Sequence, residues 1–210
     1  MFSVTKSFTL IFFLLFLSNI SNADCGDVFS TRHGPWDYNS SEGRKNLKKV
    51  EKRHFTDKVE KLIGGESTSE LMGDLNYTLN KFPNHHRALM SLVKYNKLKE
   101  GTLPQTGTTF YQTVDCYFDR AFQFKPNDWK VYQIYGIHFY INKDFEESVA
   151  MFEYALSINS SAELNYNLGL SYFKIGKFQQ AKEQAEISYK NGYPLSGLRD
   201  MLLKKGIQVE

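Results

Sequence analysis

The sequence predicts an all-α protein in which a pair of helices repeats along the chain. Residues 129–161 align on residues 162–194 with an offset of 33, and residues 116–126 align on residues 150–160 with an offset of 34. Apolar residues in these segments recur at spacings of three and four, as they do on one face of a helix. Asp and Ser residues that favour helix starts stand at the head of the repeated segments.

Composition narrows the class of protein but not its activity. Charged residues make up 23% of the 210 residues and hydrophobic residues 41%, which is typical of a folded protein and not of a disordered or multi-span membrane protein. A net charge of +3 gives no sign of nucleic-acid binding. Two cysteines are too few for a four-thiolate metal site. Aromatic residues are abundant, at 15%, and many fall where the two helices of a pair should pack.

Residues 1–23 have the pattern of a secretory signal peptide. Lys6 provides a positive start, Phe8–Leu17 is an apolar run, and small residues at 21 and 23 suit cleavage after Ala23. As a helix that run spans about 15 Å, whereas the core of a bilayer is about 30 Å thick and needs about 20 residues. We therefore expect a periplasmic or secreted protein with no membrane span after cleavage. An uncleaved anchor and a lipoprotein acylated at Cys25 are the alternatives.

Export would give the two cysteines a structural role. In an oxidising compartment Cys25 and Cys116 are the one possible intramolecular pair, and we predict that they form a disulfide. The alternative is two free thiols buried separately. The bridge would close a loop of about 92 residues and hold the mature N-terminus against the body of the protein.

Residues 24–65 differ from the rest and are predicted to be an N-terminal extension. Gly26–Tyr38 is expected to form an extended strap lying on the repeats. Arg44–Arg53 carries six basic residues and is expected to be a solvated helix face, with attraction to an anionic lipid or polymer as the alternative. Gly64 and Gly65 should end the helical part of the extension.

Residues 66–210 are expected to form the repeat domain. Leu71–Pro83 should be a second helix of a pair with its closing proline. Arg87–Leu98 and Phe110–Phe124 should be the two helices of the next pair, separated by Lys99–Thr109, which is rich in Gly, Thr and Pro. A loop of this length is unusual at a repeat joint.

Two clearer helix pairs follow. We expect Asp128 to cap the helix that starts at Trp129, and one of the serines at 160 and 161 to cap the next first helix. Turns at 142–144 and 176–177 should divide the pairs. Leu195–Lys205 should be a capping helix that covers the last apolar face.

Glycine occupies the same point of the first helix in both clear pairs, as Gly136 and Gly169. Phe152 provides a large aromatic residue on the second helix, although its counterpart is Ala185. This spacing and pattern resemble the tetratricopeptide repeat, in which small residues let two helices approach closely. The resemblance implies a solenoid of about three to four repeats. The matching small residues of the second helices are Ser148, Ala155, Ala181 and Ser188.

The mature chain is also similar, in several short blocks, to exported bacterial tetratricopeptide proteins that have no established activity. This similarity implies a fold and a compartment and adds little about function. The blocks are Cys25–Asp27, Gly34–Tyr38, His54–Thr56, Asp74–Leu79 and Phe82–Leu89.

The resemblance further implies a ligand groove lined by the first helix of each pair. The residues at groove positions form an apolar and aromatic channel with polar edges, which suits a peptide. Several of these side chains could instead pack against the strap or the capping helix, so an open and a self-covered groove both remain. The residues at groove positions are Lys130, Gln133, Ile137, Tyr140, Tyr166, Leu170, Phe173 and Lys174.

The sequence contains no convincing catalytic set, so we expect neither an enzyme nor a cofactor. His85 and His86 are the sharpest candidates for a metal site, but neighbours on a helix point about 100° apart and make a poor chelate. We expect the pair to open a helix capped by Asn84, and we expect no bound metal. Among the other histidines, His138 falls inside a repeat helix and should be packing.

We therefore expect an interaction module that binds a peptide or an envelope protein in its groove, and that does not bind nucleic acid. The alternatives are a cell-wall or polysaccharide-binding protein, in which Trp36 and tyrosines stack on sugars, and a histidine-based metal protein or hydrolase. The identity of the partner and the oligomeric state do not follow from the sequence.

Overall fold

The computed structural model describes residues 25–101, 103 and 111–209, and this part of the chain contains ten α-helices and no strand. The all-α prediction is therefore confirmed. The expected signal peptide and most of the expected loop Lys99–Thr109 lie outside the described residues. In chain order the helices are α1 (Arg44–His54), α2 (Asp57–Glu60), α3 (Leu71–Lys81), α4 (His86–Leu98), α5 (Val114–Phe124), α6 (Trp129–Asn142), α7 (Phe145–Ile158), α8 (Ala162–Lys174), α9 (Phe178–Lys190) and α10 (Gly197–Leu203).

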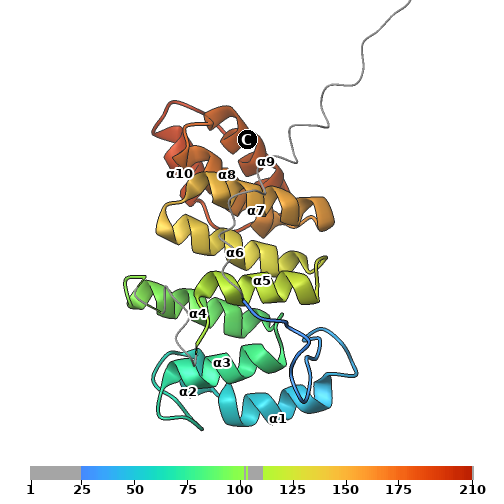
Figure 1. Cartoon of the computed structure of the whole chain (residues 1–210). Coiled ribbons are helices and arrows are strands. Elements are labelled where there is room, and N and C mark those ends of the chain that lie inside the picture. The colour runs from blue at the N-terminus through green and yellow to red at the C-terminus, as the bar shows by residue number, and fades with distance from the viewer. Residues whose placement is uncertain (1–24, 102, 104–110, 210) are drawn as a thin grey trace, which may run out of the picture.

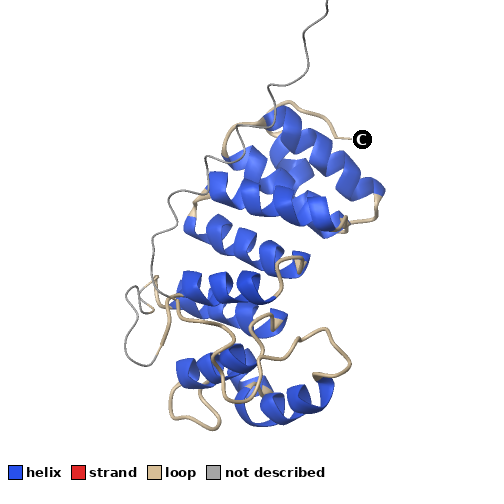
Figure 2. Cartoon of the chain, turned by 45° about the vertical axis from the view of Figure 1, so that its right-hand side comes forward, coloured by secondary structure: helices blue, strands red, loops and turns tan. Residues whose placement is uncertain are grey.

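The helices form an elongated stack that follows the order of the chain, with α1 at one end and α10 at the other (Figures 1 and 2). Consecutive helices pack on each other most extensively from α6 to α9, and α4 also packs against α6. The buried apolar side chains fall into three clusters along the stack, centred on α3–α6, on α6–α8 and on α8–α10. None of the helices just listed is long and apolar enough to cross a membrane.

Side-chain caps start the helices where the sequence indicates. Asp128 accepts a hydrogen bond from the backbone N–H of Lys130 at 3.2 Å, and Ser161 accepts one from Leu164 at 3.1 Å. Thr113 does the same for Cys116. Each cap satisfies a backbone donor that the first turn leaves unpaired, so α5, α6 and α8 begin next to a cap.

Close approach between helices depends on glycine in the first helix of each clear pair. A Cβ atom on Gly136 would lie 2.9 Å from the ring of Phe152 in α7, and one on Gly169 would lie 2.5 Å from a methyl group of Leu198 in α10. The hydroxyl of Ser148 donates to the carbonyl oxygen of Gly136 at 2.9 Å. A buried aromatic ring therefore occupies the space that a side chain at 136 would need.

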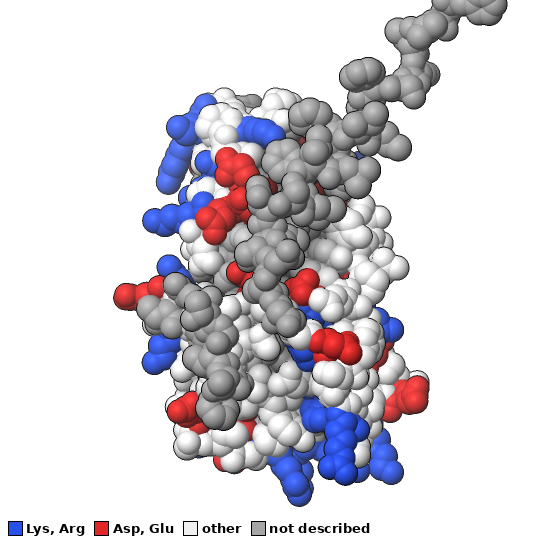
Figure 3. Space-filling view, viewed as in Figure 1, with Lys and Arg blue, Asp and Glu red and all other residues white. Residues whose placement is uncertain are grey.

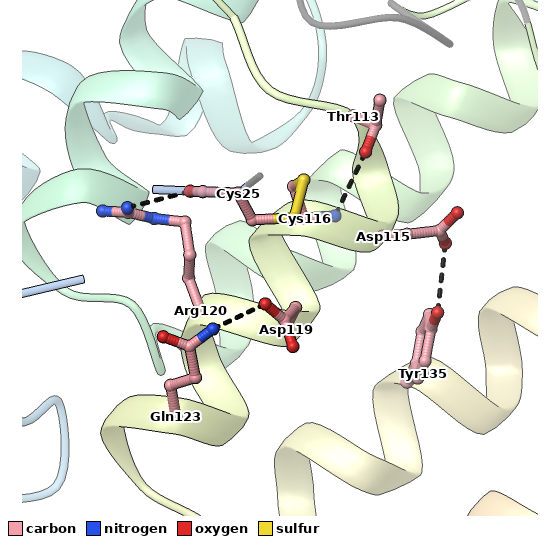
Figure 4. The surroundings of a disulfide bond; sticks show 8 residues. All are labelled: Cys25, Thr113, Asp115, Cys116, Asp119, Arg120, Gln123 and Tyr135. Carbon is pink, nitrogen blue, oxygen red and sulfur yellow. Dashed lines mark hydrogen bonds between the residues drawn. A yellow bond between two sulfur atoms is a disulfide. The ribbon is translucent and has the colours of Figure 1, made fainter. Parts of the chain in front are cut away.

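The predicted disulfide between Cys25 and Cys116 is confirmed, and it attaches the start of the described chain to α5 (Figure 4). Arg120, one turn further along α5, donates to the carbonyl oxygen of Cys25 at 3.4 Å. The strap then continues without regular structure, with Val28 fully buried and the ring of Phe29 6.1 Å from that of Phe124.

The second half of the strap crosses the junction between α3 and α4. The backbone N–H of Trp36 donates to the carbonyl oxygen of Lys81 at 2.9 Å, and the indole packs against Phe82 with ring centroids 5.5 Å apart. The ring of Tyr38 packs at a tilt against that of His85, with ring centroids 4.3 Å apart. Trp36 is thus engaged in packing, which gives it little freedom to stack on a sugar.

The basic run of the extension forms α1, which buries Val50 against the rest of the protein. Its basic side chains are all exposed, and the space-filling view shows Lys and Arg gathered at this end of the stack (Figure 3). The basic face of α1 is therefore exposed to solvent, as expected. The exposed basic residues are Arg44, Lys45, Lys48, Lys49, Lys52 and Arg53.

Candidate functional site

Six of the described helices, α2, α4, α6, α8, α9 and α10, end in the same way. In each a backbone N–H bonds to the carbonyl oxygen five residues earlier, which closes the last turn around a residue in the left-handed conformation. In α4, α6 and α8 the residues in that conformation are Glu100, Lys143 and Gly176, with φ of 54°, 73° and 78°. The closing hydrogen bonds of these three helices run from Gly101 to Asn96, from Asp144 to Phe139 and from Lys177 to Tyr172, at 2.9, 3.0 and 2.9 Å.

This shared ending aligns the three helices residue by residue. Three residues before the left-handed position stand Lys97, Tyr140 and Phe173. Tyr140 meets Phe145 edge to face at 5.4 Å, and Phe173 meets Phe178 in the same way at 5.1 Å. The aromatic pair at the turn between first and second helix is therefore a repeated feature of the stack.

A hollow of about 360 Å³ lies at these helix ends. Its apolar lining comes from Tyr140 and Ile141 of α6 and Phe145 of α7, all of them half-buried. Burial raises the pKa of Tyr140, so its hydroxyl stays protonated and can donate a hydrogen bond. The hollow is shallow and open, but its apolar lining is of the kind that ligand sites use.

Three lysines surround the apolar lining, each from a different segment. Lys97 comes from the end of α4, Lys143 from the turn after α6 and Lys174 from the end of α8. All three are exposed, and none has an ion-pair partner among the described residues. The rim of the hollow is therefore positively charged while its lining is apolar.

The predicted groove residues do not form one continuous channel. Tyr140 and Lys174 line the hollow. Lys130 is bound to Glu163 at 3.3 Å, and Gln133 is 1% exposed, with no hydrogen-bond partner for its amide among the described residues. The remaining members pack against core clusters of the stack. They are Ile137, Tyr166, Leu170 and Phe173.

The capping segment covers part of the predicted groove. Tyr166 is buried, its ring lies 4.5 Å from that of Tyr193, and a Cβ atom on Gly197 would lie 2.9 Å from its hydroxyl. The strap lies elsewhere: within the described part of the chain, no hydrogen bond, ion pair or ring contact joins it to Tyr140 or Phe173. Among residues 25–101, 103 and 111–209, neither the strap nor the capping segment covers the hollow, which is called the uncovered hollow below.

A second, larger and less open hollow of about 710 Å³ lies where the strap meets the starts of α4 and α6. His86 lies 2.9 Å from both carboxylate oxygens of Asp128. Asn84 donates to Asp128 at 2.9 Å and to Asp37 at 2.8 Å. Burial opposes ionisation of Asp128, but the hydrogen bonds from His86 and Asn84 outweigh it and hold its pKa below the usual value.

The two neighbouring histidines serve different contacts. His85, and not Asn84 as expected, caps α4, because its Nδ1 accepts the backbone N–H of Ala88 at 3.1 Å. Its other ring nitrogen lies 3.2 Å from Glu51 of α1. Burial lowers the pKa of His85 and favours its neutral form, although the hydrogen bond to Glu51 opposes this.

The two imidazoles therefore bind different carboxylates. His85 joins α4 to α1, His86 joins α4 to the start of α6, and both rings contact Tyr38 of the strap. No group of three or more His, Cys, Asp or Glu side chains in residues 25–101, 103 and 111–209 is placed to hold a metal ion. The arrangement supports a cross-linking role for the pair.

Sequence reasoning missed four residues of the uncovered hollow: Lys97, Ile141, Lys143 and Phe145. The signal that could have found them is the alignment of helix ends, since Lys143 and Phe145 stand 33 positions before Gly176 and Phe178. No protein-family model matches the chain, and no curated protein matches it either.

Proposed function

We propose that this protein is an exported helical-repeat module of the tetratricopeptide type that binds a peptide or an unfolded segment of an envelope protein. The observation that carries the proposal is the uncovered hollow at the ends of α4, α6 and α8, whose lining is apolar and whose rim is basic. The lining residues come from neighbouring repeats, so an extended chain could contact several helices at once.

The packing of the clear helix pairs supports the repeat assignment. A solenoid of helix pairs accounts for three observations together. They are the period of 33, the glycine where the two helices cross, and the packing of the Phe152 ring against Gly136. In such arrays the first helices face a shared surface that is available to ligands. The disulfide supports export, because such bridges persist mainly in oxidising compartments.

A sugar-binding role has less support, since Trp36 is packed against Phe82. A metal-dependent activity has less support as well, since His85 and His86 bind separate carboxylates. Neither alternative accounts for the uncovered hollow.

Selection from a random displayed peptide library on the purified mature protein tests the proposal. We expect enrichment of a shared motif on the wild type and its loss on Tyr140→Ala. Tyr154→Ala, which removes an exposed tyrosine outside the hollow, is the matched control and should retain the motif. Equal enrichment on wild type and Tyr140→Ala would contradict binding in the hollow.

A further inference from the structure

We propose that the basic face of α1 binds to the surface of a membrane that contains anionic lipids. The proposal goes beyond peptide binding and does not rest on it, because no residue of α1 lines either hollow. It derives from the distribution of charge around α1, from the lack of acidic partners for that charge among the described residues, and from an exposed apolar side chain at the same end of the stack.

Positive charge is confined to one side of α1. At about 100° per residue, its six basic residues fall within one half of the helical circumference, and all six are exposed. Glu51, the one acidic residue of the helix, is turned toward the protein, where it binds His85 and Arg87 at 3.2 Å. The exposed side of α1 is therefore entirely basic. The residues of the other half are all buried or half-buried, and they are Asn46, Leu47, Val50, Glu51 and His54.

The rest of the molecule does not neutralise this side. None of its six cations has an ion-pair partner within residues 25–101, 103 and 111–209. The whole chain has a net charge of +3, whereas α1 combines six basic residues with one acidic residue, so the remainder of the chain is slightly acidic. Positive charge is thus concentrated at one end of the stack (Figure 3), and such an asymmetry turns this end toward an anionic surface.

The same charges disfavour the helix that carries them. Arg44 and Lys45 lie in its first turn, where the helix dipole favours acidic residues, and Gly43 provides no side-chain cap. Like charges also recur four residues apart, as at Lys45 and Lys49, and repel each other on the helix surface. Anionic headgroups offset both effects, so this arrangement suits a charged surface better than it suits water.

An exposed apolar side chain favours a membrane over a soluble anionic polymer. Ile63 follows α2 and is 72% exposed. The segment between α2 and α3 lies at the same end of the stack as α1 (Figure 1), and the hydroxyl of Ser67 in this segment donates to the carbonyl oxygen of Arg53 in α1 at 2.6 Å. Flexible polyanions are usually held in a basic groove, whereas a basic helix face beside an exposed isoleucine suits the interface of a bilayer.

Sedimentation with vesicles tests the proposal on the mature protein with its disulfide intact. The vesicles contain phosphatidylcholine alone or an equal mixture of phosphatidylcholine and phosphatidylglycerol. We expect binding to the mixed vesicles that weakens as salt is added, and little binding to the neutral vesicles. Residues 1–23 are omitted from every variant, because their apolar run would bind lipid by itself.

A triple variant removes the centre of the basic face by the substitutions Lys45→Gln, Lys48→Gln and Lys52→Gln. A basic residue near an anionic membrane strengthens binding by about fivefold, so the triple variant should bind the mixed vesicles about 100-fold more weakly. Its melting temperature should not fall, because glutamine has nearly the helix propensity of lysine and the repulsion within α1 is reduced. A loss of binding without a loss of stability separates the charge from the fold.

The matched control removes the same charge at the other end of the stack. Lys190 ends α9, Lys204 and Lys205 follow α10, and all three are exposed. The triple variant Lys190→Gln, Lys204→Gln and Lys205→Gln should bind the mixed vesicles as the wild type does, which shows that the position of the charge matters and not its total.

The variant Ile63→Ser distinguishes lipid from a soluble polymer. It should bind the mixed vesicles about tenfold more weakly, because the isoleucine no longer enters the interface. Its binding to dextran sulfate, a soluble polyanion, should equal that of the wild type, because the basic face is intact.

Four results would overturn the proposal. One is equal binding to neutral and mixed vesicles, and another is wild-type binding by the triple variant of α1. The third is binding of the wild type to dextran sulfate without binding to mixed vesicles, which would assign the basic face to a soluble polymer. The fourth is vesicle binding by Ile63→Ser that equals that of the wild type, which would remove the argument for lipid. Each of these results leaves the peptide selection on the uncovered hollow unaffected.

Discussion

Replacing Gly136 by alanine tests whether the approach of α6 and α7 depends on the absence of a side chain. In an exposed helix, glycine costs about 1 kcal/mol relative to alanine, so the replacement alone should stabilise the protein by that amount. At position 136, however, the new Cβ atom would lie 2.9–3.0 Å from three atoms of the Phe152 ring. Carbon atoms normally stay about 3.5–4.0 Å apart, so the ring or the helix must move.

The ring has little room to move. Phe152 is 1% exposed and belongs to the cluster that α6, α7 and α8 share. Forcing an extra carbon into such a core costs about 1–3 kcal/mol. After the gain in helix propensity is subtracted from this cost, Gly136→Ala should lower the free energy of unfolding by about 1 kcal/mol. In a protein of this size that corresponds to a melting temperature about 2–4 °C lower.

A double-mutant cycle with Phe152→Leu isolates the contact. In the Phe152→Leu background the ring is gone, so Gly136→Ala should stabilise the protein by about 1 kcal/mol. The two substitutions should therefore differ from additivity by about 2 kcal/mol, measured as free energies of unfolding in urea. If Gly136→Ala stabilises the protein equally in both backgrounds, the ring of Phe152 does not limit the approach of the helices.

Three further predictions concern the contacts that hold the extension to the helices. Cys25→Ser removes a bridge across 91 positions to Cys116, and thermal unfolding should occur about 10 °C lower; an unchanged melting temperature would mean that the bridge constrains nothing. Burial lowers the pKa of His85 below its ordinary value of 6.5, so the unfolded chain binds more protons below that pH, and the free energy of unfolding should fall between pH 7 and pH 5. His85→Asn can still cap the helix and should reduce this pH dependence when unfolding is measured in urea. If the free energy of unfolding changes with pH equally in the variant and the wild type, His85 is not the group responsible. Asp128→Ala removes a helix cap and leaves the buried Asn84 amide short of a partner, so it should cost about 2–4 kcal/mol in urea unfolding, with Asp128→Asn as the milder control.

The helix starts could be predicted from sequence because capping is local. Asp128 and Ser161 each accept a backbone N–H two or three residues ahead, and α6 and α8 begin at the next residue, as expected. The glycine at 136 was equally readable, since its counterpart at 169 repeats at the period of the chain.

The cap of α4 could not be predicted in this way. Asn84 is a better capping residue than histidine on local grounds. In the structure, however, its amide bonds to Asp37 and Asp128, which lie 47 and 44 positions away in sequence. These distant acceptors occupy Asn84 and leave the cap to His85. Such a choice depends on the placement of the strap, which no local pattern records.

The uncovered hollow was only half predictable for a related reason. Groove positions along first helices identified Tyr140 and Lys174, but the hollow lies at the ends of these helices, where turn residues also take part. Lys143 and Phe145 belong to the turn and to the second helix. The unusual length of the Lys99–Thr109 segment hid the equivalence of Lys97 with Tyr140.

The position of the hollow follows from how the chain closes the two ends of its own stack. The strap covers the junction of α3 and α4, where Trp36 packs on Phe82, and α10 covers α8, where Leu198 is fully buried. Both covers consist of residues that a longer array would not need, because a further repeat would bury the same surfaces. The turn at Tyr140 lies between these covers and keeps its apolar lining. Since the described residues bury the exposed faces at the ends of the stack but not this one, the surface at Tyr140 is where the proposed partner should bind.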